Sequence, residues 1–154
     1  MKALSVRQPY AGLIIAGIKN VENRTRSPSG SIGMLAIVST AKPESAFWFN
    51  QARDKVRALG YTFPERLCSI NGAVIGVVTF DFCVWQADDG ATETDHPAIE
   101  PEELTAWWKP DYIGFIFENP RRLAVPIPAS GMMGIYTLPG DIERAVLEQF
   151  SKTS

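Results

Sequence analysis

The chain is poor in the residues that build metal sites and disulfide frameworks. It has two cysteines and one histidine among 154 residues. Cys68 and Cys83 are too few and too irregularly placed for a disulfide framework, and a lone His96 cannot complete a Cys/His zinc site. Either cysteine is more simply a small, buried apolar residue. The sequence therefore predicts no metal site and no cofactor.

Long apolar runs are also missing. No segment approaches the roughly 18 apolar residues that a membrane span needs. The first residues, Met1-Lys2-Ala3-Leu4-Ser5, lack the hydrophobic segment and cleavage pattern of a signal peptide. We therefore expect a reduced, cytoplasmic protein with no membrane partner.

The chain has no overall excess of positive charge. Its net charge of -2 and pI of about 5.4 argue against binding duplex DNA by bulk electrostatics alone. The distribution is uneven, because residues 2–26 are basic, with Glu22 as their only acidic residue, whereas residues 88–103 contain no lysine or arginine. We expect one domain over residues 1–154, with an acidic surface insertion at about 88–103 that could contact a basic protein partner.

Alternating apolar residues and turn signals predict many short strands and a few helices. The predicted strands cover residues 3–6, about 21–25, 32–39, 73–85, 112–117, 123–127 and 134–138. The predicted helices begin at Pro9, cover about 44–59 and 101–108, and run from an Asp141 cap to about Phe150. Glu118-Asn119-Pro120 is expected to form a turn between two strands, and Gly76 to mark a bend or close approach. This pattern predicts an α+β fold, a small β-barrel with packed helices.

One segment concentrates charge where a helix should end and a strand begin. Pro9 suits the first turn of a helix, and Gly17 can adopt the left-handed conformation that ends it. Lys19 follows this stop. Because side chains alternate along a strand, Glu22 and Arg24 should share one face near the lysine.

The segment from Leu4-Ser5-Val6-Arg7-Gln8-Pro9-Tyr10-Ala11 to Gly17-Ile18-Lys19-Asn20-Val21-Glu22-Asn23-Arg24 resembles the ASCH domain (activating signal cointegrator homology) of the PUA-like superfamily. It contains the whole G-x-K-x-x-E-x-R motif after an R-Q-P-aromatic helix start. Residues 36–43, 72–82 and 118–120 also resemble parts of that family. The resemblance implies a PUA-like β-barrel with a cleft beside the first helix, and binding of RNA, single-stranded nucleic acid or a modified nucleoside.

Some small bacterial relatives deacetylate acetylcytidine, and others have ribonuclease activity. In the amidohydrolases a threonine stands three residues after the motif lysine. Glu22 occupies that place here, so the resemblance transfers Lys19 but no threonine nucleophile.

The candidate nucleic-acid-binding residues each have a structural alternative. Lys19 could contact a phosphate group or act as a general base, or it could simply pair with Glu22. Glu22 could accept a hydrogen bond from the exocyclic amine of a nucleobase, act as general base, or hold a neighbouring cation in place. Arg24 could bind phosphate or form a salt bridge with Glu22. The remaining candidates, each of which could equally be structural or simply exposed, are Arg7, Gln8 (as a helix cap), Tyr10, Lys42 and Asn119.

Aromatic residues are candidates for stacking on bases. Within Phe47-Trp48-Phe49, we expect Trp48 to pack inward. Trp107 and Trp108 are consecutive on a predicted helix, so one of them should be exposed. His96 is expected at the surface.

These observations favour a nucleic-acid-binding module that holds a nucleotide in a cleft. One alternative is a hydrolase, an acetylcytidine amidohydrolase or a ribonuclease, with Lys19 and Glu22 as catalytic residues. The other is a protein-interaction domain that uses the acidic insertion.

Overall fold

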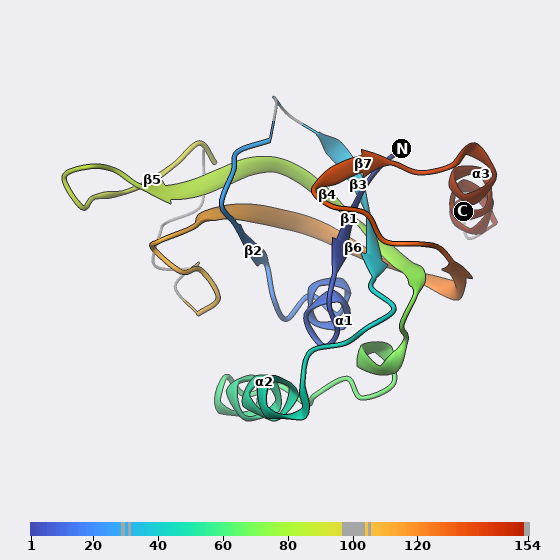
Figure 1. The fold of residues 1–154 in the computed structure, drawn as a ribbon, viewed down its shortest axis with the longest axis horizontal. Helices are drawn as coiled ribbons and strands as arrows, with labels where there is room; N and C mark the ends of the chain where they lie inside the picture. Colours follow the sequence, from blue (N-terminus) through green and yellow to red (C-terminus); the bar gives the residue numbers. More distant parts are fainter. Residues whose placement is uncertain (29, 31, 97–103, 105, 153–154) are drawn as a thin grey trace.

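A seven-stranded sheet organises the protein in the computed structural model, which describes residues 1–28, 30, 32–96, 104 and 106–152. The strand order is β2-β6-β4-β3-β1-β7, and β5 pairs with β4. The sheet curls into a half-barrel (Figure 1). The strands are β1 (Lys2–Val6), β2 (Val21–Arg24), β3 (Gly33–Ser39), β4 (Ala73–Gln86), β5 (Thr92–Thr94), β6 (Ile113–Pro128) and β7 (Ile135–Thr137).

The two long strands, β4 and β6, give the sheet its curvature. They pair antiparallel with register shifts, one of which sets Thr79–Val77 of β4 against Glu118–Arg121 of β6. Such bulges bend a strand and increase its twist. A Cβ at Gly76 would lie 2.6 Å from the carbonyl oxygen of Arg121. The expected close approach at this glycine is therefore confirmed.

Helices cover both faces of the sheet. Helix α1 (Tyr10–Ile15) packs with buried residues such as Leu4 and Ile37 on one face, and α2 (Ala46–Ala58) lies outside α1 (Figure 1). Helix α3 (Gly140–Ser151) packs through Val146 on the other face, beside Ala36 and Val38. A short 3₁₀ helix, η1 (Leu67–Ser69), contacts α1. From Leu35 to Ser39 the central strand β3 is buried on both faces, as its apolar sequence predicts.

Most predicted elements are confirmed, and the α+β class with them. Two details are wrong. The predicted turn at 118–120 does not divide the strand, because β6 continues through a bulge in which Asn119 has a φ of 50°. Asp141 does not cap α3: it lies in the first turn, after Pro139 at the N-cap position.

Three predictions about aromatic and histidine exposure are also wrong. Trp48 is 51% exposed, because the buried face of α2 is formed by Ala52 and Val56 instead. Trp107 and Trp108 are both only 7% exposed. His96 is largely covered, with Nε2 2.9 Å from Glu118 Oε1, because β5 folds this segment back along β4.

The structure describes part of the acidic segment at 88–103. Its first half contains β5, while residues 97–103 lie outside the described part, as do four of the eight residues of the helix predicted at 101–108. None of the described helices has the length and apolar character needed to cross a membrane.

Candidate functional site

The turn after α1 directs Lys19 into the protein. Gly17 has a φ of 78°, the left-handed conformation expected at a helix end. The backbone N–H groups of Ile18 and Lys19 both donate to the carbonyl oxygen of Leu13, each at 3.0 Å. The chain is thus tied back to α1 just before β2 begins.

Lys19 is almost fully buried, with 4% of the residue exposed. Its Nζ donates to the carbonyl oxygen of Val21 and lies 3.4 Å from Glu22 Oε1. The ammonium also lies 5.7 Å from the centre of the Tyr10 ring. An ammonium has three N–H donors, and two of them have hydrogen-bond partners among the described residues.

Burial lowers the pKa of Lys19 below its ordinary value of 10.5. The Glu22 carboxylate opposes this by stabilising the charged form, while the positive charges of Arg24 and Lys109 lower the pKa further. A buried ammonium close to other cations favours an additional negative charge nearby.

Glu22 stands between two cations. Its Oε2 lies 3.8 Å from Arg24 Nη2, and the same Arg24 nitrogen donates to the carbonyl oxygen of Ser5 at 3.0 Å. The predicted shared face of Glu22 and Arg24 is confirmed by this contact. The Arg24 side chain keeps 31% of its surface exposed, so its guanidinium can still meet a ligand.

Tyr10 lies beside Lys19 and lines the same part of the site. Burial, followed by the negative charges of Glu44 and Glu22, raises the pKa of its hydroxyl. Tyr10 therefore stays a neutral hydrogen-bonding group beside the Lys19 ammonium.

Two further lysines, missed by the sequence analysis, approach from distant segments. Lys55 Nζ on α2 lies 4.4 Å from the centre of the Trp107 ring. Burial, then the charges of Lys19 and Lys109, lowers the pKa of Lys55. Lys19 is thus within electrostatic range of three other cations, and we call these four side chains the cationic cluster: Lys19, Arg24, Lys55 and Lys109.

Asn23 fixes the segment that carries Lys109. Its Nδ2 donates to the carbonyl oxygen of Trp107 at 2.9 Å, and its Oδ1 accepts from the backbone N–H of Lys109 at 2.9 Å. The Trp107 indole donates to the carbonyl oxygen of Ile18 at 3.0 Å. No local pattern around residues 55 or 109 could have placed them beside Lys19, because tertiary contacts alone join these segments.

Gln8 is fully buried and has a structural role. Its Oε1 accepts from the backbone N–H of Gly12 at 2.8 Å, and its Nε2 donates to the carbonyl oxygens of Leu67 and Ile70 at 2.9 and 2.8 Å. The alternative interpretation of Gln8 as a helix cap holds only in part: Pro9 occupies the N-cap position, and Gln8, one residue earlier, accepts from the backbone N–H of Gly12.

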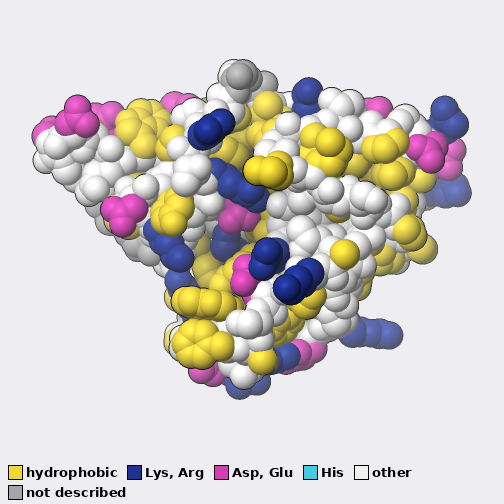
Figure 2. All heavy atoms as spheres, in the orientation of Figure 1, with side chains coloured by type: hydrophobic (Ala, Val, Ile, Leu, Met, Phe, Trp, Pro, Cys, Tyr) yellow, Lys and Arg dark blue, Asp and Glu magenta, His cyan; other side chains and the backbone are white. Residues whose placement is uncertain are grey.

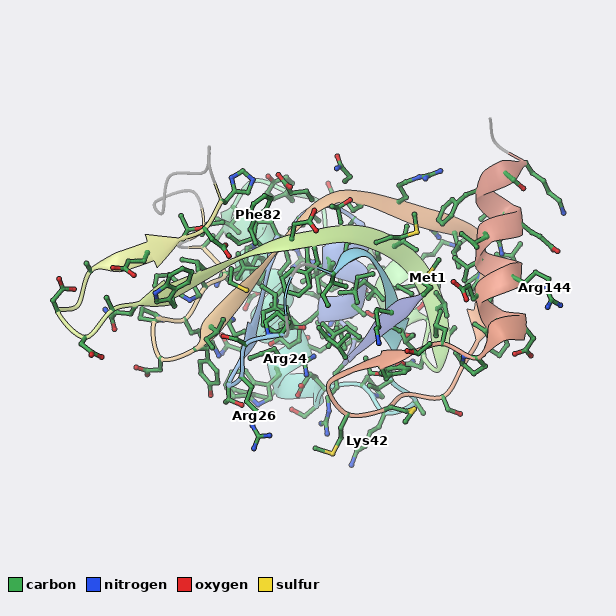
Figure 3. The ribbon with its side chains drawn as sticks, turned by 90° about the horizontal axis from the view of Figure 1, so that it is seen from above. Met1, Arg24, Arg26, Lys42, Phe82 and Arg144 are labelled. Carbon is green, nitrogen blue, oxygen red and sulfur yellow. The ribbon has the colours of Figure 1, made fainter. Side chains whose placement is uncertain are left out.

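The remaining candidates lie at the surface. Arg7, Lys42 and Asn119 are exposed, and Asn119 stands in the β6 bulge. Figure 3 shows Arg24, Arg26 and Lys42 on one side of the molecule, with Arg144 on α3 at one end. On that side, Figure 2 shows a hollow where basic side chains surround acidic ones.

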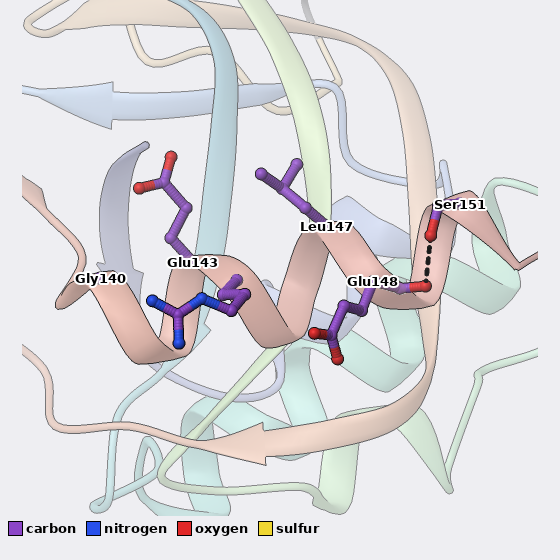
Figure 4. A pocket seen from close by; sticks show the side chains of 6 residues that line it. Gly140, Glu143, Leu147, Glu148 and Ser151 are labelled. Atoms are coloured by element: carbon purple, nitrogen blue, oxygen red, sulfur yellow. Dashed lines mark hydrogen bonds between the residues drawn. The ribbon is translucent and has the colours of Figure 1, made fainter.

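Other surface features lie away from this hollow. The shallow depression in Figure 4 is lined by α3 residues such as Arg144 and Leu147. Among the described residues, no three His, Cys, Asp or Glu side chains are grouped as a metal site would require.

The fold and motif define an ASCH domain. The ASCH domain family model matches residues 4–119, about three quarters of the chain, and the chain belongs to this family. Human Activating signal cointegrator 1 is 28% identical over 158 residues, covering 97% of this chain but only 24% of the human protein. The chain thus spans about a quarter of that relative.

Solved structures show the same fold. The crystal structure of ASCH from Zymomonas mobilis is similar with a TM-score of 0.53 and 12% identity, covering 96% of this chain and 93% of that one. A mutant of the same protein gives a TM-score of 0.53 at 14% identity, with 96% and 94% coverage. The curled sheet with its three helices is thus the PUA-like ASCH fold.

Proposed function

We propose that this ASCH domain binds RNA or single-stranded DNA and holds one nucleotide beside α1, at the cationic cluster. The observation that carries the proposal is the burial of Lys19 among three other cations in a protein of net charge -2. Glu22 is the one carboxylate in ion-pair contact with the cluster among the described residues. The cluster therefore retains an excess of positive charge that a phosphate group can offset.

The geometry offers different groups to different parts of a nucleotide. Lys19 has an N–H donor beyond its two described partners, and Arg24 presents a planar guanidinium suited to phosphate. Glu22, held by Lys19 and Arg24, can accept a hydrogen bond from an exocyclic base amine. Arg7 and Lys42 are exposed and can meet further phosphates.

Fluorescence anisotropy with labelled RNA and single-stranded DNA oligonucleotides at low salt tests this function. Lys19→Met removes the charge while keeping much of the side-chain volume, and we expect it to weaken binding about tenfold to a hundredfold. Lys152→Met, at the exposed end of α3, is the matched control and should leave binding unchanged. Equal affinity of the wild type and the folded Lys19→Met variant would refute the proposal.

A second candidate function is hydrolysis of a nucleoside amide or of RNA. It is favoured by the contact between Glu22 and an ammonium whose pKa burial lowers, a pair able to exchange a proton with a ligand. Chromatography after incubation with acetylcytidine or RNA would detect products. Undiminished turnover by the Lys19→Ala, Glu22→Ala double variant would exclude this mechanism.

A further inference from the structure

Helix α2 exposes two large aromatic side chains at its N-terminal end. Phe47 is 60% exposed and Trp48 is 51% exposed, and their rings meet edge to face with centroids 5.1 Å apart. The core does not require them, because Ala52 and Val56 form the buried face of this helix. An exposed aromatic pair on a surface helix is typical of a contact site.

The position of Trp48 on α2 directs it toward the cationic cluster. Seven residues separate Trp48 from Lys55, which is close to two full helical turns, so the two side chains lie on one stripe about 10 Å apart along the axis. Gln51 lies between them on this stripe. At the other end of the stripe, Lys55 Nζ lies 4.4 Å from the centre of the Trp107 ring, and burial, then the nearby charges of Lys19 and Lys109, lowers its pKa.

The N-terminal end of α2 lies close to the part of the site that Tyr10 lines. Just before the helix, the backbone N–H of Glu44 donates to the carbonyl oxygen of Gln8 at 2.9 Å, and the Glu44 carboxylate influences Tyr10. The end of α2 that carries Trp48 is thus near Tyr10, and Lys55, further along the helix, is near Trp107 and the other lysines. Figure 2 shows hydrophobic side chains over α2 at the lower edge of the hollow.

We propose that the stripe Trp48–Gln51–Lys55 is a second contact surface for single-stranded nucleic acid, on which an unpaired base stacks against Trp48 while Lys55 meets the backbone phosphate. This inference rests on the proposed function and extends it from one nucleotide to the strand that carries it.

Charge complementarity favours single-stranded nucleic acid as the ligand of this surface. The aromatic pair adjoins a cluster of four cations, and a nucleic-acid strand offers flat apolar bases joined by negatively charged phosphates. A base in a duplex is paired and stacked, so only a single strand, loop or end can present its face to Trp48. A purely apolar protein surface would leave the nearby lysines without a counter-charge.

The test compares a fluorescently labelled thymidine oligonucleotide with an abasic oligonucleotide of the same length, and includes an RNA arm. The wild type should bind the base-containing strand more tightly. Trp48→Ala should lose about 5- to 140-fold in affinity for it and bind the abasic strand as the wild type does. Tyr61→Ala removes another exposed aromatic side chain, 51% exposed beyond the end of α2, and should change neither affinity.

A salt series separates the two contacts. Lys55→Met should reduce the slope of log affinity against log salt by about 0.7, the value for one phosphate contact on a single strand, whereas Trp48→Ala should leave the slope unchanged. If Lys19→Met weakens binding but Trp48→Ala does not, the stacking surface is refuted and the nucleotide site stands. If no oligonucleotide binds the wild type, both proposals fail.

Discussion

Replacing Gln8 with leucine removes a buried amide that joins three backbone groups from two segments. The amide accepts from Gly12 in α1 and donates to the carbonyl oxygens of Leu67 and Ile70 in and after η1. Leucine has a similar volume and fills the same space without these bonds. The substitution therefore leaves one buried N–H group without this acceptor and two carbonyl groups without this donor.

The expected loss follows from these contacts. Each hydrogen bond contributes about 0.5–1.5 kcal/mol net, so three together correspond to about 1.5–4.5 kcal/mol. In a protein of this size each kcal/mol lowers Tm by about 2–4 °C. A loss near 3 kcal/mol would thus lower Tm by about 6–12 °C.

Urea unfolding and thermal melts measure this loss, and anisotropy below the melting range measures nucleic-acid binding. Gln51→Leu, at an exposed position on α2, is the control in the unfolding measurements alone, because Gln51 lies on the proposed contact surface. We expect Gln8→Leu to be less stable while the folded fraction keeps its affinity. A loss below 0.5 kcal/mol would refute the structural role. Normal stability with abolished binding would instead make Gln8 a ligand contact.

Two further predictions concern ionisable groups. Because the folded state lowers the pKa of Lys19, the unfolded state binds more protons between that lowered pKa and 10.5, so the free energy of unfolding should rise with pH across this window. Urea titrations at several pH values should show a larger rise in the free energy of unfolding for the wild type than for Lys19→Met. Parallel curves of unfolding free energy against pH would contradict this prediction. Any phosphate binding that depends on the Lys19 charge should weaken over the same pH range. Burial raises the pKa of Cys68 to about 12, so a thiol reagent should modify this residue only as fast as the protein opens, and rapid modification of native Cys83→Ser protein would contradict this.

Short-range patterns predicted the part of the site that lies within one segment. Gly17 ends α1, Lys19 follows, and Glu22 and Arg24 share a strand face, because helix capping and strand alternation act over a few residues. The same periodicity could not reveal the rest. Lys55 and Lys109 reach Lys19 only through the packing of α2 and the hydrogen bonds of Asn23.

The sequence-based predictions were wrong where the preference of a short segment was overruled by its contacts with distant parts of the chain. Asn119-Pro120 is a dipeptide that favours turns, yet the pairing of β6 with β4 continues past it, and a bulge forms there instead of a turn. Trp107 and Trp108 are both covered because each indole N–H finds a backbone carbonyl oxygen, of Ile18 and Tyr112 respectively. Trp48 is exposed although hydrophobicity predicts burial, because Ala52 and Val56 form the buried face of α2.

The central strands separate two surfaces that do not share side chains. Along β1 and β3, Leu4 and Ile37 face α1, while Ala3 and Ala36 face α3. A nucleotide beside α1 and a second molecule on α3 would therefore occupy opposite faces of the same strands. Neither would block the other sterically, so the α3 side is the appropriate place to attach a label, a surface tether or a fused domain.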